Sequence, residues 1–197
     1  MNKGMDVIDS KNAETGLHAT LDGVTPWLAI RIYSLRQRYV AAFFDERKME
    51  YFIPMHWDIR IDDEGHRTKK LKPVVSNIIF LKLTLPEKEI RKIISECPHP
   101  VSILKRTRNE DVLQYITARE MEEFIQICNA DVWMRKFISE EEAKLKPGQR
   151  VVVERGPLAG VTGRLVRQSH KYFLLKEIPG VAVMLKVSKW CCKALEE

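Results

Sequence analysis

Side chains that commonly perform catalysis or bind metals are scattered through this sequence rather than grouped. The five histidines are His18, His56, His66, His99 and His170. None belongs to an H-E-x-x-H or H-x-E pattern, so we expect each at the surface or in a turn. The acidic run Asp62-Asp63-Glu64-Gly65 is shorter than a calcium-binding loop. Phosphate-binding loops, dinucleotide fingerprints and nucleophile elbows are also missing, and the sequence therefore predicts no enzyme, no cofactor and no metal site.

Cysteine chemistry is equally unpromising. The four cysteines are Cys97, Cys128, Cys191 and Cys192. They form no C-x-x-C pair, and neighbours in sequence such as Cys191 and Cys192 rarely bond to each other. We expect reduced thiols, no secretory signal in residues 1–24 and no bilayer-spanning stretch, which together predict a cytoplasmic protein.

The charge balance allows a polyanionic partner without requiring one. The chain has 197 residues, 33 Lys and Arg against 27 Asp and Glu, a formal net charge of +6 and a sequence pI of about 9.1. Such a modest basic excess is compatible with contact to nucleic acid. The length and the 45% hydrophobic content predict one large or two small globular domains.

The first half of the chain alternates strand-like and helix-like patterns. Residues 1–24 are polar and predict a disordered leader. Residues 27–33 predict a buried strand, and residues 51–61 with 67–72 predict a hairpin with a charged tip. Residues 74–81 predict a further strand. Ser34 with Gln37 resembles a capping box before a helix. We expect the inward stripe of that helix to be Leu35, Tyr39, Ala42, Phe43 and Met49.

Two more amphipathic helices complete this half. Thr84 with Glu87 predicts the start of the first, whose inward residues are Ile90, Ile93, Ile94 and Cys97. Residues 101–104 predict another strand. Thr117 with Glu120 predicts the start of the second helix, with Met121, Phe124, Ile125 and Cys128 facing inward. The order β-α-β-β-α-β-α predicts an α+β fold, in which helices pack on an antiparallel sheet.

The pattern changes towards the C-terminus. Residues 131–146 are charged and predict a linker. Short valine-rich strands follow at residues 151–153, 161–166, 172–175 and 182–187, with Gly or Pro turns between them. Such spacing is typical of a small β-barrel. We therefore divide the chain into a leader (1–24), an α+β domain (25–130), a linker (131–146) and a C-terminal domain (147–197).

The loop between the first two C-terminal strands resembles the KOW motif of NusG-family factors and some ribosomal proteins. Its marked positions are Gly156, Pro157, Gly160 and Gly163. Glycine permits the positive φ of a tight connection, proline fixes one φ, and Gly163 lets a barrel strand bend. The resemblance implies an SH3-like barrel, although such a barrel could also lack any partner-binding role.

The first half of the chain narrows the resemblance to the NusG family. Trp27, Arg31, residues 52–54 and residues 73–80 resemble the NusG N-terminal (NGN) domain. Ser76 and Ile78 depart from the usual Pro and Tyr, and this departure is typical of a specialised paralogue. Residues 141–148 and the loop at residues 156–160 resemble the UpxY-type branch, whose members control capsular polysaccharide operons.

The resemblance implies a transcription antitermination and elongation factor without catalytic activity. Val75, Ile78 and Phe80 match the family's docking run, which binds the clamp helices of the polymerase β′ subunit while the domain reaches towards β. Strand alternation leaves a plain core role open for part of this run. Arg36, Arg38 and Lys82 are candidates for contact with non-template DNA, as is the basic arm at residues 67–70, and solvated surface positions remain the alternative.

The resemblance also implies that the C-terminal domain recruits a ribosomal protein, a termination factor or nascent RNA. Two other classes stay open. A ribosome-associated or RNA-binding KOW protein would bind RNA without polymerase. An enzyme with an unfamiliar site would need a deep pocket with converging polar side chains.

Overall fold

The computed structural model describes residues 17–18, 22–61, 63, 65–107, 111–128 and 135–195. Most of the predicted leader lies outside these residues. Within it, Leu17–His18 forms strand β1 and pairs with β3, so the leader prediction was wrong at this point. The Asp22 side chain is also held in place, because its carboxylate accepts hydrogen bonds from the backbone N–H groups of Val24 and Thr25.

The first half of the chain folds into an antiparallel sheet, hereafter the N-terminal sheet. Its strands follow the order β1-β3-β6-β2-β7, and β8 also pairs with β2. They are β1 (Leu17–His18), β2 (Trp27–Ile32), β3 (Tyr51–Phe52), β6 (Ile78–Lys82), β7 (Val101–Ile103) and β8 (Tyr115–Ile116). This architecture confirms the predicted α+β fold of the first half, with β8 as an addition to the expected strands.

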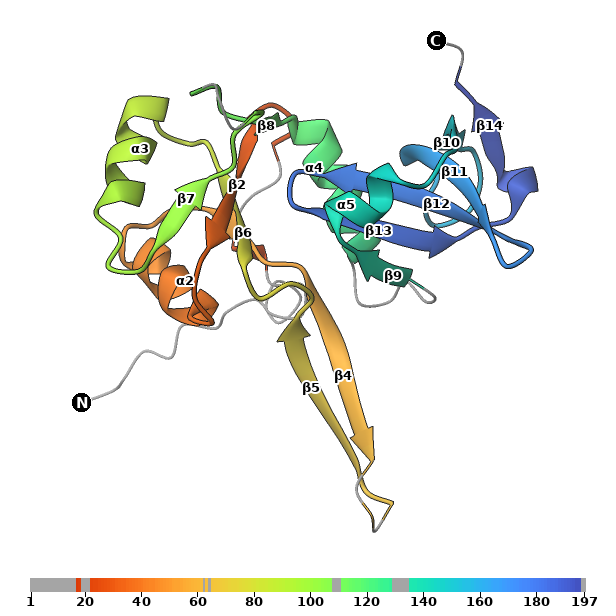
Figure 1. Cartoon of the computed structure of the whole chain (residues 1–197), viewed down its shortest axis with the longest axis horizontal. Helices are drawn as coiled ribbons and strands as arrows, with labels where there is room; N and C mark the ends of the chain where they lie inside the picture. The colour runs from red at the N-terminus through yellow and green to blue at the C-terminus, as the bar shows by residue number, and fades with distance from the viewer. Residues whose placement is uncertain are drawn as a thin grey trace.

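Helices cover both faces of the N-terminal sheet. Alternation along β6 sends Ile79 and Leu81 towards α2 (Gln37–Glu46) and α3 (Glu87–Ser95). The same alternation sends Ile78 and Phe80 to the opposite face, where α4 (Ala118–Cys128) packs. In Figure 1, α2 and α3 lie on one side of the sheet, and α4 lies on the side that faces the C-terminal strands.

The helix starts show which capping predictions hold. At α4, the Thr117 hydroxyl accepts from the Glu120 N–H and the Glu120 carboxylate accepts from the Thr117 N–H, which confirms that capping box. At α2 the N-cap is Arg36, and Gln37 instead donates its amide to the carbonyls of Val75 and Ile78. The Ser34 prediction was therefore wrong. At α3 the N-cap is Pro86, without a side-chain capping bond.

The inward stripe predicted for the first helix was partly wrong. Leu35 is 92% exposed because the helix begins only after it, and Tyr39 is 48% exposed. The buried residues of α2 are Gln37, Val40, Ala41, Phe43 and Phe44. Val40, Phe43 and Phe44 follow the spacing i, i+3, i+4.

The predicted hairpin is present and stands apart from the sheet. Strand β4 (Met55–Ile61) pairs with β5 (Arg67–Pro73) along its whole length. The two form a separate two-stranded ribbon that projects away from the rest of the molecule (Figure 1). The strand predicted at residues 74–81 begins only at Ile78, because residues 74–77 form a bend and a turn.

The second half of the chain forms another antiparallel sheet, hereafter the C-terminal sheet, with the order β14-β10-β11-β12-β13-β9. The strands are β9 (Arg135–Ile138), β10 (Gln149–Val153), β11 (Thr162–Gln168), β12 (Lys171–Ile178), β13 (Val181–Lys186) and β14 (Cys192–Ala194). Helix α5 (Glu140–Lys144) follows β9, and the 3-10 helix η1 (Lys189–Cys191) precedes β14. The strands include the four valine-rich strands expected from the sequence.

The linker prediction was wrong for much of residues 135–144. Strand β9 pairs with β13, and α5 follows it with a side-chain cap from Ser139. The physical reason is that β9 adds an edge strand whose Ile138 is buried beneath the sheet. Residues 129–134 lie outside the described residues.

The glycines of the KOW-like loop adopt two different roles. Gly156 and Gly160 have φ values of +91° and +90°, in the left-handed region that favours glycine. At Gly163, a Cβ atom would lie 2.7 Å from the Leu175 carbonyl oxygen, so its missing side chain permits close approach of β12. Pro157 lies in the same turn as Gly156 and Gly160.

Candidate functional site

An apolar face on the N-terminal sheet contains two of the three residues predicted to bind a partner. We define the apolar face as Phe52, Ile78, Phe80 and Phe124. The ring centroids of Phe80 and Phe124 are 5.6 Å apart, and those of Phe52 and Phe124 are 6.2 Å apart. Aromatic side chains supply the largest apolar areas available to a binding surface.

Helix α4, which contributes Phe124, and the C-terminal sheet together cover this side of the N-terminal sheet. Ile78 and Phe80 are 2% and 0% exposed, and they share one continuous core with Val181, Val183 and other residues of the C-terminal sheet. In this conformation Ile78 and Phe80 are therefore core residues, which is the alternative that strand alternation left open, and neither is exposed to a partner. Burial of large apolar side chains from both sheets is the main stabilising contribution to their docking.

The two sheets come into close contact at the turn from β12 to β13. Gly180 has a φ of +87°, and a Cβ atom there would lie 2.4 Å from Cδ1 of Ile78. The Ile78 side chain therefore packs directly against the backbone at Gly180.

Replacing Gly180 with alanine should weaken docking more than the same change at Gly156. Both glycines have positive φ, so both variants carry the backbone strain of about 1–2 kcal/mol. Only position 180 adds a clash with Ile78, since a Cβ at Gly156 would meet no atom within 4 Å. Urea unfolding should show a larger loss for Gly180→Ala, and equal losses would contradict this contact.

A buried ion pair crosses the same interface. Lys176 Nζ of β12 lies 2.5 Å from Glu123 Oε2 of α4, with side-chain exposures of 7% and 9%. Thr162 donates its backbone N–H and its hydroxyl to the same carboxylate, at 3.1 and 2.8 Å. Arg119 meets the other carboxylate oxygen at 3.2 Å. Removing one member of such a buried pair costs about 3–5 kcal/mol, because the remaining charge stays buried without its partner.

The Glu123–Lys176 pair should make docking sensitive to acid. Burial raises the pKa of Glu123, but its hydrogen bonds with Lys176 and Thr162 outweigh burial and hold the pKa below the ordinary 4.5. A carboxylate with a lowered pKa stabilises the docked state above its ordinary pKa, and this contribution is lost as the pH falls through the lowered value. We expect small-angle scattering to show expansion starting below pH 4.5. A Glu123→Gln variant should lack this step, whereas an unchanged pH profile in that variant would refute the assignment.

The loop at residues 156–160 also touches the N-terminal half. Gln126 Nε2 of α4 donates to the Pro157 carbonyl at 2.9 Å. Sequence patterns missed Glu123, Gln126 and Lys176 as interface residues. On their own elements they look like ordinary polar residues, and only the folded chain brings together positions 53 residues apart.

Val75, the third residue predicted to bind a partner, packs against the core that contains Ile78 and Phe80 but is less buried than either. It is half-buried beside an open depression of about 500 Å³ that Tyr33, Leu35 and Ser76 also line. The predicted docking run is therefore partly exposed at Val75 and buried at Ile78 and Phe80.

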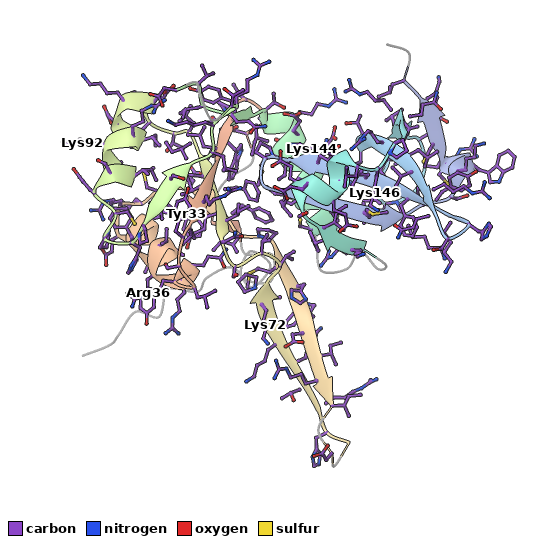
Figure 2. The ribbon with its side chains drawn as sticks, in the orientation of Figure 1. Tyr33, Arg36, Lys72, Lys92, Lys144 and Lys146 are labelled. Atoms are coloured by element: carbon purple, nitrogen blue, oxygen red, sulfur yellow. The ribbon has the colours of Figure 1, made fainter. Side chains whose placement is uncertain are left out.

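Arg36 and Arg38 lie on an exposed surface at the start of α2. The Arg38 guanidinium lies 4.8 Å from the centre of the Tyr39 ring. Tyr39 in turn lies 5.8 Å from the His99 ring. Figure 2 shows Arg36 and Tyr33 on this part of the molecule, away from the C-terminal sheet. A surface of arginine and aromatic side chains suits contact with a nucleic-acid backbone and its bases.

Lys82, in contrast, is not available for nucleic acid in this structure. Strand alternation places it on the same side of β6 as Ile78 and Phe80, and it is 2% exposed. Its ammonium lies 2.9 Å from Asp22 and 3.4 Å from Glu50. Two carboxylates therefore neutralise the charge that phosphate contact would need, and the prediction for Lys82 was wrong for this conformation.

The described residues contain no group of three or more His, Cys, Asp or Glu side chains placed to hold a metal ion. All four cysteines are free thiols. None of the helices in the described part of the chain is long and apolar enough to cross a membrane.

Comparison with known proteins identifies the family. The family model described as transcription termination factor nusG matches residues 25–125, which is half of the chain and includes the N-terminal sheet strands from β2 onwards, the hairpin and most of α4. A search of curated proteins found no match. The matched region contains the apolar face and the exposed arginines described above. The chain therefore belongs to the NusG family of transcription factors, which are not enzymes.

Proposed function

We propose that this protein is an antitermination and elongation factor that binds the clamp helices of the RNA polymerase β′ subunit through the apolar face and reaches towards the β subunit. The observation that supports this proposal is the apolar face itself. Ile78 and Phe80 stand at the positions of the family's docking run. Phe80 contacts the rings of Phe52 and Phe124, and Ile78 belongs to the same core. A ligand that binds one clamp state more tightly shifts the polymerase towards that state, and this disfavours pausing and termination.

Polymerase binding at this face requires the two sheets to separate. We propose that they belong to two domains, an NGN domain and an SH3-like KOW barrel, and that the structure is the closed form. The same side chains cannot contact the C-terminal sheet and the clamp helices at once. When only a fraction of molecules is open, the apparent Kd rises by the inverse of that fraction.

We further propose an operon-specific role in surface-polysaccharide gene expression, as in the UpxY-type branch, and a cytoplasmic location. In the open form the KOW domain would be free to recruit a ribosomal protein, a termination factor or RNA. Arg36 and Arg38 would contact non-template DNA beside the bound polymerase. Such phosphate contacts would weaken with rising salt and add little sequence preference.

The test is affinity capture with the full-length chain at low ionic strength. Recovery of the β and β′ subunits supports the proposal. Recovery of ribosomal RNA alone supports a ribosome-associated KOW protein instead. Profiling of polymerase occupancy after gene deletion then separates the operon-specific role from a general one, because loss confined to one long operon is expected only for the former.

A further inference from the structure

Among the strands that the structure describes, β4 and β5 pair only with each other, and one face of their hairpin carries exposed apolar side chains. Residues opposite each other across the ribbon share a face, so Trp57 with Leu71, Ile59 with Lys69 and Ile61 with Arg67 lie on one side. Ile59 and Ile61 are 59% and 62% exposed. A lone two-stranded ribbon is marginally stable in water. The exposed isoleucines therefore indicate a surface that binds something.

The charges on the strands favour a polyanion as the partner. The two strands contain Arg60, Arg67, Lys69, Lys70 and Lys72 against one acid, Asp58. Asp58 is already paired, at 2.5 Å from Lys72 and 3.1 Å from Arg60. Figure 2 shows Lys72 on this projecting arm, where the excess charge stands clear of the main body. Excess cations on both faces suit an element flanked by two rows of phosphates.

The hairpin is poorly suited to single strands. Binding of unpaired bases depends on free aromatic surfaces for stacking. Trp57 is half-buried, and Lys69 Nζ lies 3.9 Å from the centre of its ring, so one ring face is occupied. The exposed large apolar side chains of the hairpin, Ile59 and Ile61, are aliphatic. Such residues contact thymine methyl groups or wedge between base steps of a duplex.

The dimensions fit the major groove of B-form DNA. Seven residues per strand span roughly 23 Å at the usual rise. The major groove is about 12 Å wide and admits a two-stranded ribbon, whereas the deep, narrow major groove of duplex RNA does not. The turn sequence contains Asp62, Asp63 and Glu64, which repel phosphates. The strands, not the turn, therefore make the contact.

We propose that the β4–β5 hairpin is a duplex-DNA-binding arm, with Ile59 and Ile61 towards the groove floor and the long side chains of Arg67 and Lys70, one on each face of β5, reaching the flanking phosphates. This binding needs neither polymerase nor separation of the two sheets, since the hairpin is exposed in the closed form. Its failure would therefore leave the proposed polymerase function untouched.

The test measures fluorescence anisotropy of a short DNA duplex with the full-length chain at low and moderate salt. The double variant Arg67→Gln/Lys70→Gln should lower affinity about tenfold at low salt and reduce the slope of log K against log salt by about 2, one unit for each lost phosphate contact. The matched control is Lys88→Gln/Lys92→Gln on α3, which removes the same charge far from the hairpin, as Figure 2 shows for Lys92, and should change little.

Two further measurements decide between partners. Ile59→Gln/Ile61→Gln should lower duplex-DNA affinity severalfold without changing the salt slope, because no phosphate contact is lost. The proposal would be overturned if the hairpin and α3 charge variants lost the same duplex-DNA affinity. It would also be overturned if the protein bound duplex RNA or a single strand more tightly than duplex DNA. Reduced binding of the isoleucine variant to core polymerase, with unchanged binding to DNA, would assign the hairpin to a protein partner instead.

Discussion

Replacing Glu123 with alanine should raise the affinity of the full-length chain for core RNA polymerase by roughly 10- to 100-fold. The change leaves Lys176 buried without its carboxylate partner in the closed form. In the open form, alanine on α4 is a good helix former, so the apolar face keeps its shape. If the variant destabilises only the closed form, by about 3 kcal/mol, the equilibrium constant for opening rises roughly a hundredfold.

Binding of labelled core enzyme to immobilised protein measures this effect. Glu122→Ala is the matched control, because it makes the same charge change one residue earlier on α4, outside the Glu123–Lys176 pair. The charge swap Glu123→Lys/Lys176→Glu should restore part of the closed form and lower the affinity again. If Glu123→Ala and Glu122→Ala bind polymerase equally, the closed form does not limit binding.

Replacing Ile78 with glutamate should have the opposite effect on polymerase binding. The variant places a charge against Gly180 and within the shared core, so the two sheets should separate. The same charge should also prevent the apolar face from docking onto the clamp helices. We expect an expanded molecule by small-angle scattering and a loss of affinity of at least tenfold relative to Glu123→Ala, the other open variant.

The comparison with Glu123→Ala separates opening from binding. Both variants open the molecule, but only Ile78→Glu damages the apolar face. Circular dichroism controls for unfolding of the N-terminal sheet. If Ile78→Glu remains folded and opens the molecule but binds polymerase as tightly as Glu123→Ala, the apolar face is not the polymerase-binding surface.

Grooves with charged linings lie between the two halves, and they support the proposal that the two sheets can separate. One groove of about 480 Å³ is lined by Arg119, Glu120, Arg150 and Arg164 among other residues, and a second of about 460 Å³ runs between Arg31 and Glu141. Charged side chains therefore surround the apolar centre of the interface. A polar rim around an apolar core is the usual anatomy of interfaces that can separate.

Local features of the fold were readable from the sequence because they depend on neighbours along the chain. The Thr117–Glu120 capping box, the β4–β5 hairpin and the positive φ at Gly156 and Gly160 all follow from short patterns and are present in the structure. The patterns failed at Leu35, because the helix starts two residues later than predicted, and at β9, because pairing with a distant strand decides its burial.

The sequence by itself determined the α+β first half, the strand-rich second half and the resemblance to the NusG family. It also determined that both faces of β6 are apolar. Only the tertiary structure decided what covers Ile78 and Phe80, and that Lys82 faces Asp22 and Glu50. The physical reason is that the hydrophobic effect has no direction: an apolar strand looks the same in sequence whether its own chain or a partner buries it.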